Sequence, residues 1–355
     1  MTTGDQGNNP WAWSGLLRWS LNYVDGTVDR PDATPMSAED KAFLEKVMKD
    51  GIVDEGERMK FILKEATNAM EYYRARAAEN ENIGDPPITD EALEDLLVEL
   101  RDIVEQIDFA RAFCSLQGLP FLLGCIQQPE IPASIRHVCL GLLSTLGQNN
   151  PPVQQQLLEL GALKILSDLF FDEATSTATK AKVMQSMSSL ICNHEVCETV
   201  FTQLPQSPEL FLAGLDPASA STSLRSKSLF FLRALVTSDL ATSSRIRTFQ
   251  KPILLVADGD SYLGEAASSE LRELAIAFLE RLLEDRKGGA RLLLTRKNAL
   301  AALGVQRISA LRSLTGEDRE FAQVELEHWE NVMTLLSRAT PEEESKDEET
   351  LLIKS

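Results

Sequence analysis

The sequence predicts an all-α protein built from stacked helical repeats. Apolar residues recur at helical spacing from Thr89 to about Arg338. A second observation is a pattern of residues that returns every 43 to 47 positions. Third, 19 glycines and 15 prolines among 355 residues are too few for a sandwich of many short strands joined by turns.

The repeat is clearest in four helices that each begin with a basic residue, 46, 43 and 47 positions apart: Arg136, Lys182, Arg225 and Arg272. Four, seven and ten places further on, three of the four rows carry only apolar residues, and the row after Lys182 is the weaker one. A period in this range is typical of armadillo and HEAT repeats. Because one such unit cannot bury its apolar face alone, we expect a solenoid with a concave binding surface.

The chain is too long for a single hydrophobic core, and we divide it by composition and pattern. We expect armadillo-like repeats over 89–314, with capping helices at 37–88 before them and at 315–338 after them. Residues 1–36 are expected to form a flexible N-terminal segment. Residues 339–355 are expected to form an acidic disordered tail.

The net charge of −19 argues against several classes of partner. A nucleic-acid-binding protein needs a basic surface, and an anionic membrane would repel this chain in the same way. No stretch of 18 apolar residues is present, so we expect no membrane span. Five cysteines without regular spacing fit reduced thiols. We therefore expect the protein in the cytosol, with the nucleus as a second location. Because a long acidic solenoid is usually monomeric, we expect a monomer.

Catalytic and metal-binding motifs are missing from the sequence. It contains no G-x-S-x-G, H-E-x-x-H, P-loop or G-x-G-x-x-G pattern. Cys192, His194 and Cys197 are close together, but structural zinc takes four ligands, so we interpret them as part of a helical core. His328 is interpreted as a histidine with a satisfied hydrogen bond. We expect no enzyme activity, no cofactor and no metal.

Asparagines stand at the ends of two repeat helices: Asn149 and Asn150 before a proline, and Asn193 before a histidine. One interpretation is structural, because asparagine favours helix C-termini. The other is that these amides line the concave groove, together with the basic residues that begin the same helices, Arg136 and Lys182, and bind a partner. The residue pattern leaves both open.

Three of the four tryptophans gather in a short N-terminal stretch that includes Trp13 and Trp19. This stretch either covers the first helices as a hydrophobic lid or offers an apolar patch to another protein.

Five stretches of the sequence, in their order and spacing, are landmarks of a known family: Gly15-Leu16-Leu17-Arg18-Trp19-Ser20-Leu21, Asp108-Phe109-Ala110, Gly147-Gln148-Asn149-Asn150-Pro151, Leu190-Ile191-Cys192-Asn193-His194 and Leu224-Arg225-Ser226-Lys227-Ser228-Leu229. With them the chain resembles the armadillo-type nucleotide exchange factors of the Hsp70 chaperones, which form the Fes and Hsp70-binding protein family. The resemblance is closest to the plant and algal branch of that family. The resemblance covers roughly residues 13 to 290. The unit around residues 205–220 and the C-terminal part depart from the family pattern.

The resemblance implies that the chain binds the ATPase domain of a cytosolic Hsp70 chaperone, accelerates ADP release and so promotes client release. It also implies a set of groove contacts, with Ala110 and Arg225 foremost and with Arg136, Asn149, Asn150 and Asn193 beside them. It further implies an N-terminal segment that assists client release, with Trp13, Leu16, Leu17 and Trp19 as its apolar residues.

Two other classes of function stay open at this point. An armadillo adaptor would bind a peptide or protein without exchange activity; such proteins carry repeated Trp and Asn on successive groove helices, and the four repeat helices here contain no Trp. A regulatory subunit of an enzyme is the third possibility, and its sign would be co-purification with a catalytic partner.

Overall fold

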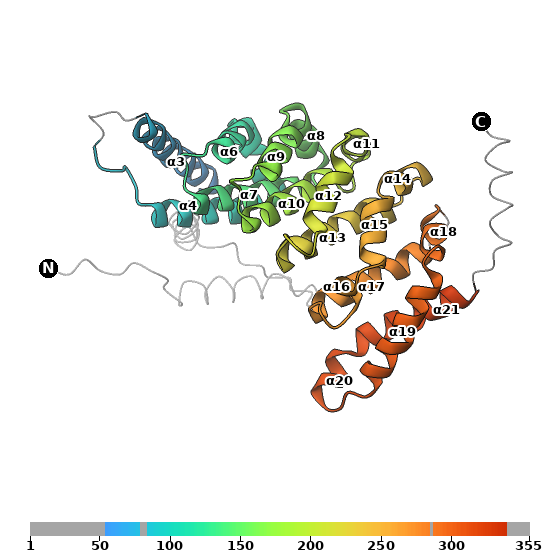
Figure 1. Ribbon diagram of the computed structural model, residues 1–355. Coiled ribbons are helices and arrows are strands. Elements are labelled where there is room, and N and C mark those ends of the chain that lie inside the picture. Colours follow the sequence, from blue (N-terminus) through green and yellow to red (C-terminus); the bar gives the residue numbers. More distant parts are fainter. Residues whose placement is uncertain (1–53, 79–83, 285–286, 339–355) are drawn as a thin grey trace, which may run out of the picture. The chain divides into compact units, whose positions relative to one another are not determined.

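The computed structural model describes residues 54–78, 84–284 and 287–338, which form helices joined by turns, with no strand among them (Figure 1). The chain divides into two compact units, Met1–Arg58 and Met59–Ser355. Only the last five residues of the first unit are described, so the following account concerns the second. The all-α prediction is confirmed.

Two helices precede the repeats, α3 (Glu55–Ala77) and α4 (Asp90–Val104). Then a group of two short helices and one long helix recurs. The first three groups are α5 (Ile107–Ser115), α6 (Gly118–Gln127) and α7 (Ala133–Gly147); α8 (Pro151–Glu159), α9 (Ala162–Phe171) and α10 (Thr177–Ile191); and α11 (Glu195–Gln203), α12 (Ser207–Leu215) and α13 (Thr222–Thr237).

The later groups are less regular. The fourth contains an additional short helix: α14 (Ser243–Thr248), α15 (Gln250–Ala257), α16 (Asp260–Leu263) and α17 (Ser269–Glu284). The C-terminal helices are α18 (Gly289–Leu294), α19 (Lys297–Arg312), α20 (Glu317–Phe321) and α21 (Gln323–Arg338). The boundaries of the predicted domains stay predictions, and the predicted N-terminal segment and acidic tail lie outside the described residues.

The long helices form one continuous row in which α4, α7, α10, α13, α17 and α21 each pack on the next (Figure 1). Local sequence defines where several of them begin. The hydroxyls of Thr89, Ser176 and Ser221 accept backbone N–H groups from the first turns of α4, α10 and α13. Such N-caps satisfy donors that have no partner within the helix. The predicted apolar rows are buried in this packing, as Leu140 and Leu229 illustrate.

The weak row after Lys182 has a physical explanation. Ser186 is buried, and its hydroxyl donates to the carbonyl of Leu140 on α7 at 2.9 Å and lies 3.1 Å from the hydroxyl of Ser144. A small hydrogen-bonded side chain here replaces the larger apolar one that the repeat pattern predicts. Gly147 at the end of α7 lies beside α10, and an added Cβ there would make an ordinary contact, 3.4 Å from the carbonyl oxygen of Ser189. The weak row therefore marks a hydrogen-bonded contact between α7 and α10.

The unit around residues 205–220, which departs from the family pattern, is held together by aromatic packing. Phe201, Phe211, Phe231 and Phe249 come from α11, α12, α13 and the junction of α14 with α15, and all four are fully buried. Their ring centroids lie 5.0 to 6.4 Å apart. This is the range in which aromatic pairs contribute beyond their buried area.

Two adjacent phenylalanines on α13 allow a matched test of this cluster. Phe231→Ala removes a ring at the centre of the buried cluster and is expected to lower the free energy of unfolding by about 3–5 kcal/mol. Phe230→Ala is the control: this side chain is 58% exposed, and its loss is expected to change stability by less than about 0.5 kcal/mol. Urea unfolding followed by circular dichroism measures both. Equal effects of the two substitutions would contradict the assigned packing.

Candidate functional site: a groove along the long helices

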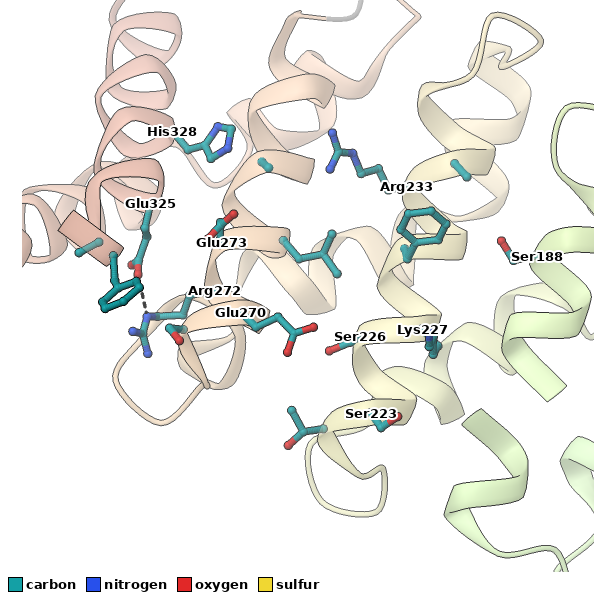
Figure 2. Close-up of a pocket in the computed structure, with 18 of the residues that line it drawn as sticks. Ser188, Ser223, Ser226, Lys227, Arg233, Glu270, Arg272, Glu273, Glu325 and His328 are labelled. Atoms are coloured by element: carbon teal, nitrogen blue, oxygen red, sulfur yellow. Dashed lines mark hydrogen bonds and ion pairs between the residues drawn. The ribbon is translucent and has the colours of Figure 1, made fainter. Parts of the chain in front are cut away.

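A groove of about 1550 Å³ runs along the row of long helices. Its lining comes from the end of α7, from α10, α13 and α17, and from α19 to α21. Figure 2 shows Ser188 on one side, Ser223, Ser226, Lys227 and Arg233 on α13, and the α17 and α21 residues beyond them. The volume exceeds the roughly 300–1000 Å³ typical of pockets for small molecules. The dimensions therefore suit a macromolecular partner.

Helical periodicity explains which residues of α13 line the groove. Residues three and four apart lie on one face of a helix. Ser226, Lys227, Phe230 and Arg233 are all on the groove side, while Phe231 and its neighbours on the opposite stripe are buried in the stack. Among the residues that the structure describes, Lys227 and Arg233 form no ion pair. This wall thus presents an exposed aromatic ring between two positive charges.

The opposite wall is predominantly acidic. Glu270 and Glu273 of α17 line the groove, and Figure 2 shows Glu270 and Arg233 extending into the space between α17 and α13. Behind this wall, Glu325 of α21 is buried between two arginines, with 3.1 Å to Arg272 Nε and 2.8 Å to Arg307 Nη2. A buried carboxylate needs such pairing, so this triad ties α17, α19 and α21 together.

Two asparagines stand at the groove end of consecutive long helices. Asn149 and Asn193 each follow the end of a helix, α7 and α10, and adopt the left-handed conformation with φ of 52° and 63°. Asparagine tolerates this conformation better than most residues. Asn193 Nδ2 donates to Asn149 Oδ1 at 3.2 Å, and both residues are exposed and line the groove. The two interpretations given for these residues are therefore compatible.

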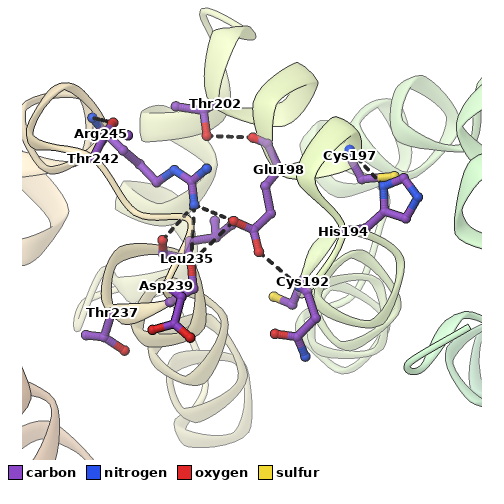
Figure 3. Close-up of polar contacts among 12 residues, drawn as sticks. Cys192, His194, Cys197, Glu198, Thr202, Leu235, Thr237, Asp239, Thr242 and Arg245 are labelled. Carbon is purple, nitrogen blue, oxygen red and sulfur yellow. Dashed lines mark hydrogen bonds and ion pairs between the residues drawn. The ribbon is translucent and has the colours of Figure 1, made fainter. Parts of the chain in front are cut away.

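A buried network holds the Asn193 turn in place (Figure 3). Glu198 of α11 is fully buried and accepts the backbone N–H of Asn193 at 2.9 Å. Its other oxygen pairs with Arg245 Nη1 from α14, and Arg245 also donates to the carbonyl of Leu235 near the end of α13 at 3.0 Å. One carboxylate thereby connects the ends of α10 and α13. Sequence reasoning did not identify it, because its partners are 47 and five residues away along the chain.

Two predicted contact residues prove to be buried. Arg225 is 9% exposed, its guanidinium lies 4.4 Å from the centroid of the Tyr262 ring, and it donates to the carbonyl of Ser261. Ala110 is 2% exposed within α5. Neither lines the groove. Their positions favour packing roles, and a contribution to partner binding stays a prediction.

The remaining predicted site residues are placed as follows. Asn150 occupies the N-cap position of α8 without a capping hydrogen bond from its side chain, and Arg136 lies in α7; both are half-buried and outside the groove lining. Their role in partner binding also stays a prediction. The residues of the predicted client-release segment lie outside the described part of the chain: Trp13, Leu16, Leu17 and Trp19.

The close spacing of Cys192, His194 and Cys197 is explained by the start of helix α11. Nδ1 of His194 accepts the backbone N–H of Cys197 at 3.3 Å and so caps α11. Over the residues that the structure describes, no group of three or more His, Cys, Asp or Glu side chains is arranged to hold a metal ion. The prediction for His328 is confirmed: its Nδ1 lies 2.5 Å from a carboxylate oxygen of Glu280.

No single helix in the described part is long and apolar enough to cross a membrane. The α5 and α6 helices meet the criteria of length and composition only as a pair, and they are bent by 76° relative to each other.

Several known proteins resemble this chain in sequence, one of them along nearly its whole length. A mouse protein, Hsp70-binding protein 1, is 27% identical over 94% of this chain and 87% of its own length. The chain is therefore similar in sequence to an Hsp70-binding protein. A protein of Schizosaccharomyces pombe named Hsp70 nucleotide exchange factor fes1 is 31% identical over 43% of this chain and 52% of its own length. No family model matches the chain.

Solved structures support the fold class. A designed armadillo repeat protein in complex with the peptide (KR)4 superimposes with a TM-score of 0.50, over 73% of this chain and 99% of that protein, at 15% identity. The armadillo-like architecture and the resemblance to the Hsp70-binding protein family are therefore confirmed. The assignment to a plant or algal branch stays a prediction.

The Glu198 network gives a prediction for stability. Glu198→Ala leaves the Arg245 guanidinium buried without its counter-charge and is expected to lower the free energy of unfolding by about 3–5 kcal/mol. The control is Asp168→Ala, which removes the exposed pair between Lys164 and Asp168 and is expected to cost less than about 1 kcal/mol. Chemical denaturation measures both values. A cost for Glu198→Ala no larger than that of the control would contradict the assigned role.

The cysteines give a second prediction. Burial raises the pKa of the Cys192 thiol to about 12 and that of Cys197 to about 11, from an ordinary value of 9.0. The folded chain therefore keeps protons that the unfolded chain loses above pH 9, and the free energy of unfolding is expected to fall as the pH rises from about 9 toward 12. At pH 8, a thiol reagent should label Cys197, which is fully buried, far more slowly in native than in denatured protein. Equal rates would contradict its burial.

Proposed function

We propose that this chain is a co-chaperone that binds the ATPase domain of a cytosolic Hsp70 chaperone and accelerates ADP release, promoting client release. The observation that carries this proposal is the similarity over 94% of the chain to a protein named Hsp70-binding protein 1. A second relative bears the name of an Hsp70 nucleotide exchange factor. The groove is large enough to receive part of a folded domain.

Such a function needs binding and no chemistry on a substrate. An exchange factor accelerates ADP release if it binds the opened ATPase domain more tightly than the closed one. Each tenfold acceleration requires about 1.4 kcal/mol of that difference, if all of it appears in the release barrier. A rigid groove suits this role, because a surface that does not adapt to the closed domain favours the opened one. We propose that the protein acts as a monomer and is not an enzyme.

Among the contacts implied by the resemblance, Asn149 and Asn193 have the best support, because they are exposed in the groove. Their amides are already paired with each other, so one carbonyl oxygen and several N–H groups are left to meet a partner. The pair is also fixed in position by Glu198, which reduces the entropy lost on binding.

The test is the dissociation rate of a fluorescent ADP analogue from a purified cytosolic Hsp70 chaperone, with and without this protein. A concentration-dependent acceleration is expected. Asn149→Gly combined with Asn193→Gly keeps the left-handed backbone but removes both amides, and is expected to weaken binding about three- to tenfold. Gln250→Ala, an exposed amide outside the groove, is the matched control and should leave binding unchanged.

Other outcomes separate the alternatives. Binding without any change in the ADP release rate would contradict exchange activity and favour an adaptor. The absence of both binding and acceleration would contradict the proposed function altogether.

A further inference from the structure

Two exposed phenylalanines face the same groove from different walls, and we propose that they are the apolar anchors for its partner. Phe230 belongs to α13 and Phe321 to α20. This inference rests on the proposed function and deepens it: the occupant is the ATPase domain of an Hsp70 chaperone. That domain would present an apolar ridge with acidic groups toward α13 and basic groups toward α17.

The exposure of these two rings is the first argument. Phe230 is 58% exposed although the next residue on α13, Phe231, is fully buried, and Phe321 on the short helix α20 is 81% exposed. Single exposed apolar residues are common on protein surfaces. Two large aromatic rings lining one groove form an arrangement typical of interface hot spots, where aromatic anchors carry much of the binding energy.

The charges around the rings are the second argument. Lys227 and Arg233 lie three residues before and after Phe230, so the three side chains form one stripe along α13. Across the groove, Glu270 and Glu273 of α17 present acidic groups. This separation of charge gives the groove a direction, and a complementary partner can bind in only one orientation.

The composition of the groove favours a folded domain over an extended peptide. In the groove lining, amides at helix ends occur after two of the long helices, with Gln148 and Asn149 after α7 and Asn193 after α10, and α7, α10, α13 and α17 contain no Trp. A repeated ladder of such residues is therefore missing from this groove. A second copy of this chain is also a poor occupant, because two chains of net charge −19 repel each other.

The experiment measures the affinity of the full-length chain for a purified Hsp70 ATPase domain by isothermal titration calorimetry. The variants are Phe230→Ala, Phe321→Ala and the double variant. Each single change is expected to weaken binding at least about tenfold, because hot-spot truncations cost more than about 1.4 kcal/mol. Phe171→Ala is the matched control, since that ring is 42% exposed and lies outside the groove lining, and it should leave affinity within about twofold.

A charge variant tests the direction of the groove. Lys227→Glu with Arg233→Glu is expected to reduce the association rate and to flatten its dependence on salt, because the α13 wall would no longer attract acidic groups. Thermal unfolding of every variant should match that of the unmodified chain, because the altered side chains are on the surface.

The outcomes distinguish this inference from the proposed function. If the unmodified chain binds and accelerates ADP release, but the phenylalanine variants bind equally well, the inference is wrong and the proposed function stands. If the unmodified chain does not bind the ATPase domain, both fail. A chain that forms dimers, and becomes monomeric with Phe230→Ala, would show that a second copy occupies the groove and would overturn the inference.

Discussion

The packing of each long helix between two others is the constraint on which the rest of this structure depends. In the row from α4 to α21, every inner helix is covered on two sides by its sequence neighbours in the stack. The helices of a group pack on one another, but the long helix also needs the long helices on either side to bury its remaining apolar surface. The faces that the packing leaves open are the ones that line the groove. The groove lining and the hydrophobic core are thus formed by two different faces of the same helices.

Polar contacts add precision to this apolar stack at two places, where buried carboxylates join neighbouring helices. Glu198 connects the ends of α10 and α13 through Asn193, Arg245 and Leu235, and Glu325 connects α17, α19 and α21 through Arg272 and Arg307. Buried charges are costly unless they are paired and hydrogen-bonded, and here both conditions are met. Such networks fix the relative positions of neighbouring units, which apolar contacts alone define less sharply. These polar networks therefore help to define the shape of the groove.

Much of the fold could be predicted from the sequence, because periodicity of apolar residues reports directly on which helix face is buried. The helix that begins after Thr89 and the position of Asn149 and Asn193 at helix ends follow from local signals. The residues of the site are harder to predict from the sequence. Arg225 looked like a groove residue, but its guanidinium lies over Tyr262, a contact across 37 positions that no local pattern records. Phe230 was overlooked, although an aromatic residue on the polar stripe of an amphipathic helix, flanked by Lys227 and Arg233, is a signal that sequence alone contains.

The stack of nearest-neighbour contacts has a consequence for how the molecule responds to heat. In a linear array, the terminal elements have one neighbour instead of two, so the chain frays from its ends before it melts as a whole. The C-terminal end of the array, α19 to α21, also supplies one wall of the groove. A partner bound across α13 and α20 would connect an inner helix with a helix of the C-terminal end. Its binding energy would therefore oppose the unfolding of the C-terminal end. The protein would then be most resistant to heat while it is engaged with its partner.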